Sequence, residues 1–95
     1  MHSIHKIIHF KVQRPYVIEV IFEDEVVKVV DLGLVLKGEM HGPLNDPEIF
    51  SRAALDKETN TIFWPNGADF DPSLLYDWDL HKEELQERAR QWPAH

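Results

Sequence analysis

The first third of the chain alternates apolar and polar residues with a period of two, which is the pattern of β-strands that bury one face. Residues 4–12 and 16–22 follow this alternation, and residues 26–30 form a run rich in β-branched side chains. In the first segment the apolar even positions are Ile4, Ile8, Phe10 and Val12. Pro15 separates the first two segments, because proline cannot donate a hydrogen bond to a strand ladder. The pattern predicts a three-stranded antiparallel meander over about residues 4–32.

Two Asp-Pro pairs predict the starts of helices later in the chain. Asp46-Pro47 and Asp71-Pro72 each combine a capping oxygen with a proline at the first helical position. We expect a short helix over about residues 47–52 and a C-terminal helical segment over about residues 72–92. Residues 53–64 predict a second hairpin, because two apolar runs flank a polar turn. The expected fold class is therefore α+β with two layers, in which the two helical segments cover the meander and the second hairpin.

The length and the charge of the chain narrow the functional classes. Ninety-five residues allow one domain, spanning residues 1–95. Ten basic and seventeen acidic side chains give a net charge of −7, and residues 1–37 are neutral, so the whole excess lies in residues 38–95. An acidic chain is poorly suited to bind a phosphate backbone or an anionic membrane surface. No apolar run is long enough to span a membrane and the start does not resemble a signal peptide, so we expect a cytoplasmic protein.

The polar side chains match no catalytic or metal-binding motif. The chain has no cysteine, which excludes disulfides and a thiolate nucleophile. On a strand, His5 and His9 would lie about 13 Å apart, which is too far for one metal ion. Asp71 is best explained as a helix cap, and Asp69 as an acceptor of hydrogen bonds from loop amides. We therefore expect no catalytic residue, no metal site and no cofactor.

Aromatic residues gather in the second half of the chain. They are Phe63, Trp64, Phe70, Tyr76, Trp78 and Trp92. Nucleic-acid platforms interleave such rings with Arg and Lys, whereas here the neighbours are Asp and Glu. We expect most of these rings to form the core. Trp78 and Trp92, on the thin apolar stripe of the last helical segment, are candidate interface residues.

A corner follows the second hairpin, where Trp64-Pro65-Asn66-Gly67-Ala68-Asp69 ends a strand. Pro65 prevents the strand from continuing, and Gly67 permits a backbone angle that other residues resist. One interpretation is a structural turn that buries Trp64. The other is a binding site formed by Trp64, Asn66, Gly67 and Asp69.

Four segments carry a resemblance to a known family: residues 16–22, 29–32, 42–50 and 62–69. The last of them, Ile-Phe-Trp-Pro-Asn-Gly-Ala-Asp, is the most specific. In this order the segments resemble a bacterial family, the domain of unknown function 2442, over about residues 4–78. The resemblance implies a small two-layer α+β fold and no established activity. The family usually places Asp-Gly in the first hairpin turn, where this chain has Asp24-Glu25.

The resemblance also suggests a class of function. Some relatives resemble partners of small proteins in toxin–antitoxin-like pairs, whereas others carry an added DNA-binding domain, for which this chain has too few residues. We expect a non-catalytic protein-interaction module, an antitoxin-like partner in a bacterial two-protein system, whose acidic half meets a basic protein. One alternative is a small-molecule-binding or catalytic domain with its site near the Trp64–Asp69 corner. A second is a DNA-associated regulator, and a homo-oligomer is left open.

Overall fold

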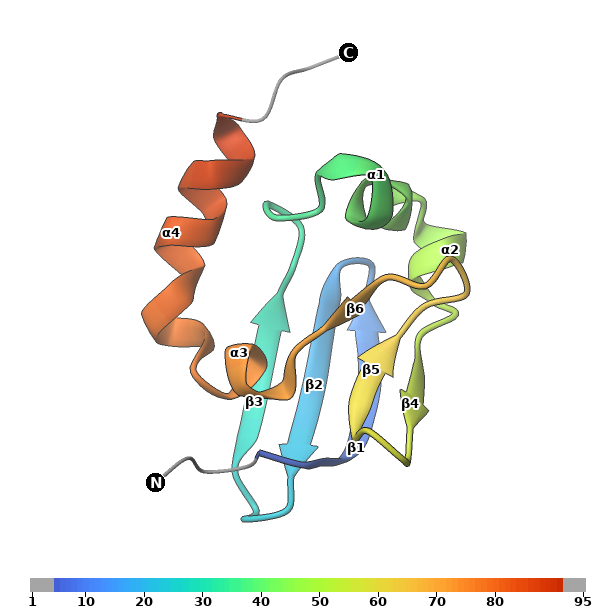
Figure 1. Cartoon of the computed structure of the whole chain (residues 1–95), viewed down its shortest axis with the longest axis vertical. Helices are drawn as coiled ribbons and strands as arrows, with labels where there is room; N and C mark the ends of the chain where they lie inside the picture. Colours follow the sequence, from blue (N-terminus) through green and yellow to red (C-terminus); the bar gives the residue numbers. More distant parts are fainter. Residues whose placement is uncertain (1–4, 92–95) are drawn as a thin grey trace.

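Two three-stranded antiparallel sheets make up the framework of the protein. The computed structural model describes residues 5–91. The first sheet has the order β1-β2-β3 and consists of β1 (Ile7–Arg14), β2 (Val17–Phe22) and β3 (Val27–Asp31). The second has the order β4-β5-β6 and consists of β4 (Ala54–Asp56), β5 (Thr61–Phe63) and β6 (Asp69–Phe70). Figure 1 shows the second sheet in front of the first.

Short helices connect the two sheets, and a longer helix follows them. The connection comprises α1 (Gly38–His41), the 3₁₀ helix η1 (Gly42–Asn45) and α2 (Pro47–Phe50). After β6 come α3 (Pro72–Tyr76) and α4 (Trp78–Arg90). Both Asp-Pro starts are confirmed, because the Asp46 carboxylate accepts a hydrogen bond from the Glu48 amide and the Asp71 carboxylate accepts one from the Ser73 amide.

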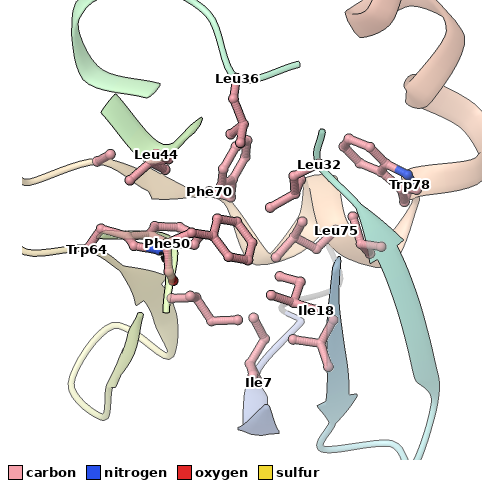
Figure 2. Packing of buried hydrophobic residues seen from close by; sticks show 14 of the residues in the cluster. Ile7, Ile18, Leu32, Leu36, Leu44, Phe50, Trp64, Phe70, Leu75 and Trp78 are labelled. Carbon is pink, nitrogen blue, oxygen red and sulfur yellow. Dashed lines mark hydrogen bonds between the residues drawn. The ribbon is translucent and has the colours of Figure 1, made fainter. Parts of the chain in front are cut away.

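The hydrophobic core lies between the two sheets and extends under the helices. Apolar side chains from both sheets, from α2 and α3, and from the connection between β3 and α1 meet there (Figure 2). The fully buried side chains are Ile7, Ile18, Val20, Phe22, Val30, Leu32, Leu36, Leu44, Phe50, Ile62, Trp64 and Leu75. The α+β fold class, with a meander and a second hairpin packed with short helices, is therefore confirmed.

The predicted inward face of the first strand is wrong at one position. Ile7 is fully buried and Ile8 is 57% exposed, although the alternation placed Ile8 inside. The cause is a bulge in β1, because Ile7 pairs with Phe22 whereas His9 pairs with the next residue, Ile21. An extra residue in one strand reverses the side to which the preceding side chains point. Beyond the bulge, Phe10 packs against the core as expected.

Two predicted segments also differ in extent. The second hairpin gains a third strand, β6, whose residues were not predicted to be in a strand. The C-terminal segment is not one continuous helix, because Asp77, with φ −98° and ψ 27°, separates α3 from α4. Within residues 5–91, no helix is long and apolar enough to cross a membrane.

Candidate functional site

The corner from Trp64 to Asp69 begins with a tryptophan that the core encloses. Trp64 is buried, and its indole N–H donates a hydrogen bond of 2.8 Å to the Phe50 carbonyl oxygen. Its ring packs against Phe50 and Phe70, with centroid distances of 5.6 and 5.8 Å (Figure 2). A buried indole needs such an acceptor, since an unpaired N–H in an apolar core is costly. Trp64 therefore fastens the corner to α2.

A three-residue turn forms the corner itself. The Gly67 amide donates to the Trp64 carbonyl oxygen at 2.9 Å, and the Trp64 amide donates to the Ala68 carbonyl oxygen at 2.9 Å. This pattern is a hairpin loop whose third residue adopts a left-handed conformation. Gly67 has φ +89°, and a Cβ atom at this position would lie 3.3 Å from the Met40 methyl carbon. Glycine thus meets both a backbone requirement and a steric one.

Hydrogen bonds of Asn66 and His41 connect the turn to α1. The Asn66 Nδ2 group donates to the Met40 carbonyl oxygen at 2.8 Å, while its Oδ1 accepts from the Ala68 amide at 3.1 Å. The His41 Nε2 atom lies 2.9 Å from the Asp69 carbonyl oxygen, and the His41 ring packs against Phe70. Both polar ends of the Asn66 side chain are therefore engaged within the fold.

An exposed rim borders the corner. We define this rim as the four residues Glu39, Met40, Phe63 and Asp69. Phe63 is 38% exposed and lies directly opposite Asp69 in the β5–β6 pair, so both side chains point to the same face of the sheet. Met40, 46% exposed, lies beside Gly67. Among residues 5–91, the Asp69 carboxylate forms no hydrogen bond and no ion pair. The expectation that it accepts hydrogen bonds from loop amides is therefore wrong. The rim thus presents two apolar side chains beside free carboxylates.

A shallow cavity opens next to the rim. It has a volume of about 490 Å³ and is lined by the consecutive residues Lys37 to His41. Gly38, with φ +90°, is one of the lining residues, and Glu39 and Met40 belong to both the cavity and the rim. Because one short segment lines the cavity, its polar groups come from Lys37, Glu39 and His41 alone.

Most acidic side chains in the second half of the chain form no ion pair within residues 5–91. Twelve Asp and Glu residues lie between positions 38 and 91, and Asp79, Glu84 and Glu87 form ion pairs with basic side chains. The other nine form none within residues 5–91. Arg90 lowers the pKa of Glu87 by donating a hydrogen bond to it. The second half of the chain therefore has a largely uncompensated negative surface.

A second polar cluster joins the turn between β2 and β3 to α3. The Tyr76 hydroxyl donates a 2.6 Å hydrogen bond to Asp24, and the His5 ring stacks on Tyr76 at a centroid distance of 3.7 Å. The hydrogen bond lowers the pKa of Asp24 and raises the pKa of Tyr76, because it favours the ionised carboxylate and the neutral phenol. His9, in contrast, is exposed on β1. Among the described residues, no group of three or more His, Asp or Glu side chains could hold a metal ion.

Trp78 and Trp92 were the two candidate interface residues of the last helical segment, and the structure describes only the first of them. Trp78 is wrong as a surface residue, because it is only 4% exposed and belongs to the hydrophobic core (Figure 2). Its position at the first residue of α4, beside α3, turns the ring inward. Trp92 lies outside the described residues. The exposed apolar residue of α4 is instead Leu80, at 78%.

Sequence reasoning grouped Phe63 with the core aromatics and did not single out Met40. The alternation of Ile62, Phe63 and Trp64 could have placed Phe63 outside, since its two neighbours are buried. Nothing in the sequence indicates that Met40 reaches Gly67, because that contact depends on how α1 meets the corner.

Comparison with known proteins gives a match over most of the chain. A family model described as "Protein of unknown function (DUF2442)" matches residues 7–81. The matched region contains both sheets, the corner with its rim, and the start of α4. No curated protein and no solved structure gives a significant match.

Proposed function

The chain belongs to the DUF2442 family of proteins of unknown function, and on that premise we propose that it is a non-catalytic protein-interaction module. In this proposal it is the antitoxin-like member of a bacterial two-protein pair and works in the cytoplasm. Its partner is a basic protein that docks on the rim of the corner. The observation that carries the proposal is the rim itself, where exposed Phe63 and Met40 lie beside free carboxylates.

The chemistry of the rim suits a protein partner. Exposed aromatic rings supply much of the binding energy at protein interfaces, and methionine adapts its shape to the surface that it meets. Phe63 is held in place because both its strand neighbours, Ile62 and Trp64, are buried. A rigid anchor loses little conformational entropy on binding.

The charge of the second half supports a basic partner. Asp69 and Glu39 belong to the nine acidic residues without an ion pair among residues 5–91. Negative potential accelerates encounter with a positively charged protein and disfavours acidic competitors. We therefore expect Lys or Arg side chains of the partner to meet Asp69 while an apolar side chain packs on Phe63.

A photo-crosslinking amino acid at position 63, introduced in the native host, tests the proposal. Position 80 on α4 is the matched control, because Leu80 is more exposed than Phe63 but lies away from the rim. We expect one basic protein to be captured from position 63 and not from position 80. No capture at position 63, capture of an acidic protein, or equal capture from both positions would contradict the proposal.

The cavity beside the rim favours a second candidate function, binding of a small molecule. Its volume of about 490 Å³ falls in the range of ligand sites, about 300–1,000 Å³. Lys37 would offer a donor to an anionic ligand, and Glu39 an acceptor. Native mass spectrometry of protein purified from the host, before and after denaturation, tests this candidate. A released metabolite would support it, and a mass equal to that of the bare chain would count against it.

A further inference from the structure

The corner contains a pair of residues whose order favours one chemical change. Asn66 is followed by Gly67, and this is the only asparagine–glycine pair among the three asparagines of the chain. The backbone nitrogen of the next residue attacks an asparagine carboxamide most readily when that residue is glycine, which has no side chain to hinder the approach. Asparagine is a thermolabile residue in proteins. Both Asn66 and Gly67 are exposed, so water reaches the pair.

The change converts Asn66 in two steps that consume only water. In the first step, a bond forms between the Gly67 nitrogen and Cγ of Asn66, while the Cγ–Nδ2 bond breaks. The proton of the Gly67 amide leaves with Nδ2 as ammonia, and the product is a five-membered succinimide. In the second step, a water molecule opens the ring at one of its two carbonyl carbons. The result is either aspartate, with the backbone unchanged, or isoaspartate, in which the backbone runs through Cγ.

The folded corner holds the groups that react and the group that leaves. The Gly67 amide donates to the Trp64 carbonyl oxygen at 2.9 Å, so the attacking nitrogen is engaged in the turn. The leaving group, Nδ2 of Asn66, donates to the Met40 carbonyl oxygen at 2.8 Å, and Oδ1 accepts from the Ala68 amide at 3.1 Å. The carboxamide must rotate toward the Gly67 nitrogen before the ring can close. The native hydrogen bonds therefore slow the reaction.

The helix α1, which supplies one of these bonds, is held by few buried groups. None of its four residues is buried. Besides the bond from Asn66, a second link joins α1 to the corner, because the His41 ring lies 2.9 Å from the Asp69 carbonyl oxygen and packs against Phe70. Elements with few buried apolar contacts open locally at a low free energy. Separation of α1 from the corner releases Nδ2 of Asn66.

We propose that Asn66 is a site of spontaneous deamidation whose rate is set by the docking of α1 on the corner. While α1 is docked, the carboxamide is held at both of its polar atoms and reacts slowly. When α1 separates, the carboxamide loses the bond that holds its leaving group, and the ring closes once the turn opens. The inference does not rest on the proposed function, because it concerns the isolated chain.

Deamidation weakens the docking of α1 irreversibly. Either product lacks the donor to the Met40 carbonyl oxygen and carries a carboxylate, which that oxygen repels. Isoaspartate also adds one atom to the backbone between Trp64 and Ala68, so the two hydrogen bonds of the turn no longer fit. Because Glu39 and Met40 lie on α1, deamidated molecules present an altered rim.

Incubation of the full chain at mildly alkaline pH, with and without denaturing urea, tests the site. Asn45 and Asn60 are internal controls, because Asp46 and Thr61 follow them and have side chains that hinder the attack. Peptide mass spectrometry gives the deamidated fraction at each asparagine, and an isoaspartate assay reports the ring opening. We expect Asn66 to react fastest of the three in both conditions, and about tenfold more slowly in the folded chain than in urea. Equal rates for Asn66 in both conditions, or no excess over the two controls, would overturn the proposal.

Two histidine variants test the control by α1. His41→Ala removes the second link to the corner, whereas His9→Ala, at an exposed position of β1, is the matched control. We expect His41→Ala to accelerate deamidation of Asn66 in the folded chain about threefold, and His9→Ala to leave the rate unchanged. Repetition in urea below the unfolding transition separates local from global opening, because separation of α1 exposes little surface and depends weakly on urea. Equal rates in the two variants, or a rate that rises with urea as steeply as global unfolding, would overturn the control by α1.

Discussion

The same three-residue turn occurs twice in this protein, once between β2 and β3 and once at the corner between β5 and β6. In the first, the Glu25 amide donates to the Phe22 carbonyl oxygen and the Phe22 amide to the Val26 carbonyl oxygen. In the second, Gly67, Trp64 and Ala68 make the equivalent bonds. The third residue has a positive φ in both, +72° at Glu25 and +89° at Gly67.

The middle residues of the two turns, Asp24 and Asn66, also make equivalent hydrogen bonds. The Asp24 carboxylate accepts from the Val26 amide and from the Tyr76 hydroxyl. The Asn66 amide group accepts from the Ala68 amide and donates to the Met40 carbonyl oxygen. One side chain thus closes each turn and joins it to a distant element, α3 in one case and α1 in the other.

The difference between the turns lies in the third residue and its surroundings. Glu25 is exposed, so its side chain extends into solvent. The only loss of stability at this position therefore comes from its left-handed backbone conformation. A side chain at Gly67 would meet Met40 as well. This turn therefore tolerates a non-glycine residue where it is isolated, and it requires glycine where α1 packs against it.

Gly67→Ala should have the largest effect on stability. We expect it to lower the free energy of unfolding by about 1–2 kcal/mol, because alanine resists this backbone angle and its Cβ atom crowds Met40. Glu25→Ala is the matched control in the equivalent position and should change stability by less than about 0.5 kcal/mol. Urea melts of both variants measure this. Equal losses in both would break the comparison.

Asn66→Ala should cost somewhat less. It removes two hydrogen bonds at an exposed site, each worth about 0.5–1.5 kcal/mol, and we expect a total loss of about 1 kcal/mol. Asn66→Asp retains the acceptor for the Ala68 amide but loses the donor to Met40, and should fall between the parent and Asn66→Ala. Denaturant titrations give the three values. An alanine variant as stable as the parent would show that Asn66 does not anchor the corner.

Glu25→Gly should have a smaller effect of the opposite sign. Glycine relieves the strained angle but gives the unfolded chain more freedom, so we expect a net gain of only about 0.5 kcal/mol. Glu23→Gly, in the same turn but without a positive φ, should be destabilising. Thermal melts of the two glycine variants decide this. A loss of stability in Glu25→Gly would contradict the assigned strain.

Tyr76→Phe should have the smallest effect, visible mainly in the dependence of stability on pH. The lowered pKa of Asp24 means that its ionised form contributes stability above its usual pKa of 3.8, and that this contribution disappears as the pH falls through the folded-state value. Without the Tyr76 hydroxyl, the pKa of Asp24 should rise toward its usual value and the acid loss of stability should become shallower. An NMR titration of the Asp24 carboxyl carbon measures the pKa in the parent and the variant. Identical titration curves would rule out the assigned hydrogen bond.

The sequence predicted the strands better than the contacts among them. Alternation identifies β2 well because its inner residues Ile18, Val20 and Phe22 are all buried. The same rule fails at Ile8, because a bulge depends on pairing with β2 and leaves no mark in the composition of β1. The two Asp caps could be predicted because capping is local, involving residues only two positions apart.

The candidate site could be predicted only in part for the same reason. The turn at Gly67 follows from local chemistry, and its positive φ was foreseeable from Asn66-Gly67. The bonds from Asn66 to Met40 and from His41 to Asp69 join residues 26 and 28 positions apart. Trp78 was a candidate interface residue because the thin apolar stripe of the last helical segment does not reveal that Trp78 packs into the core. Long-range packing, and not local propensity, decides these positions.

We propose that the interior of the corner maintains the fold while its rim binds a basic partner. Asp69→Lys tests it most directly, because the Asp69 carboxylate makes no hydrogen bond or ion pair within residues 5–91 and yet lies opposite Phe63. The measurement is the yield of the crosslink from position 63, taken together with the free energy of unfolding. We predict a loss of most of the crosslink with a change in stability of less than about 0.5 kcal/mol. An unchanged crosslink in this stably folded variant would contradict the claim.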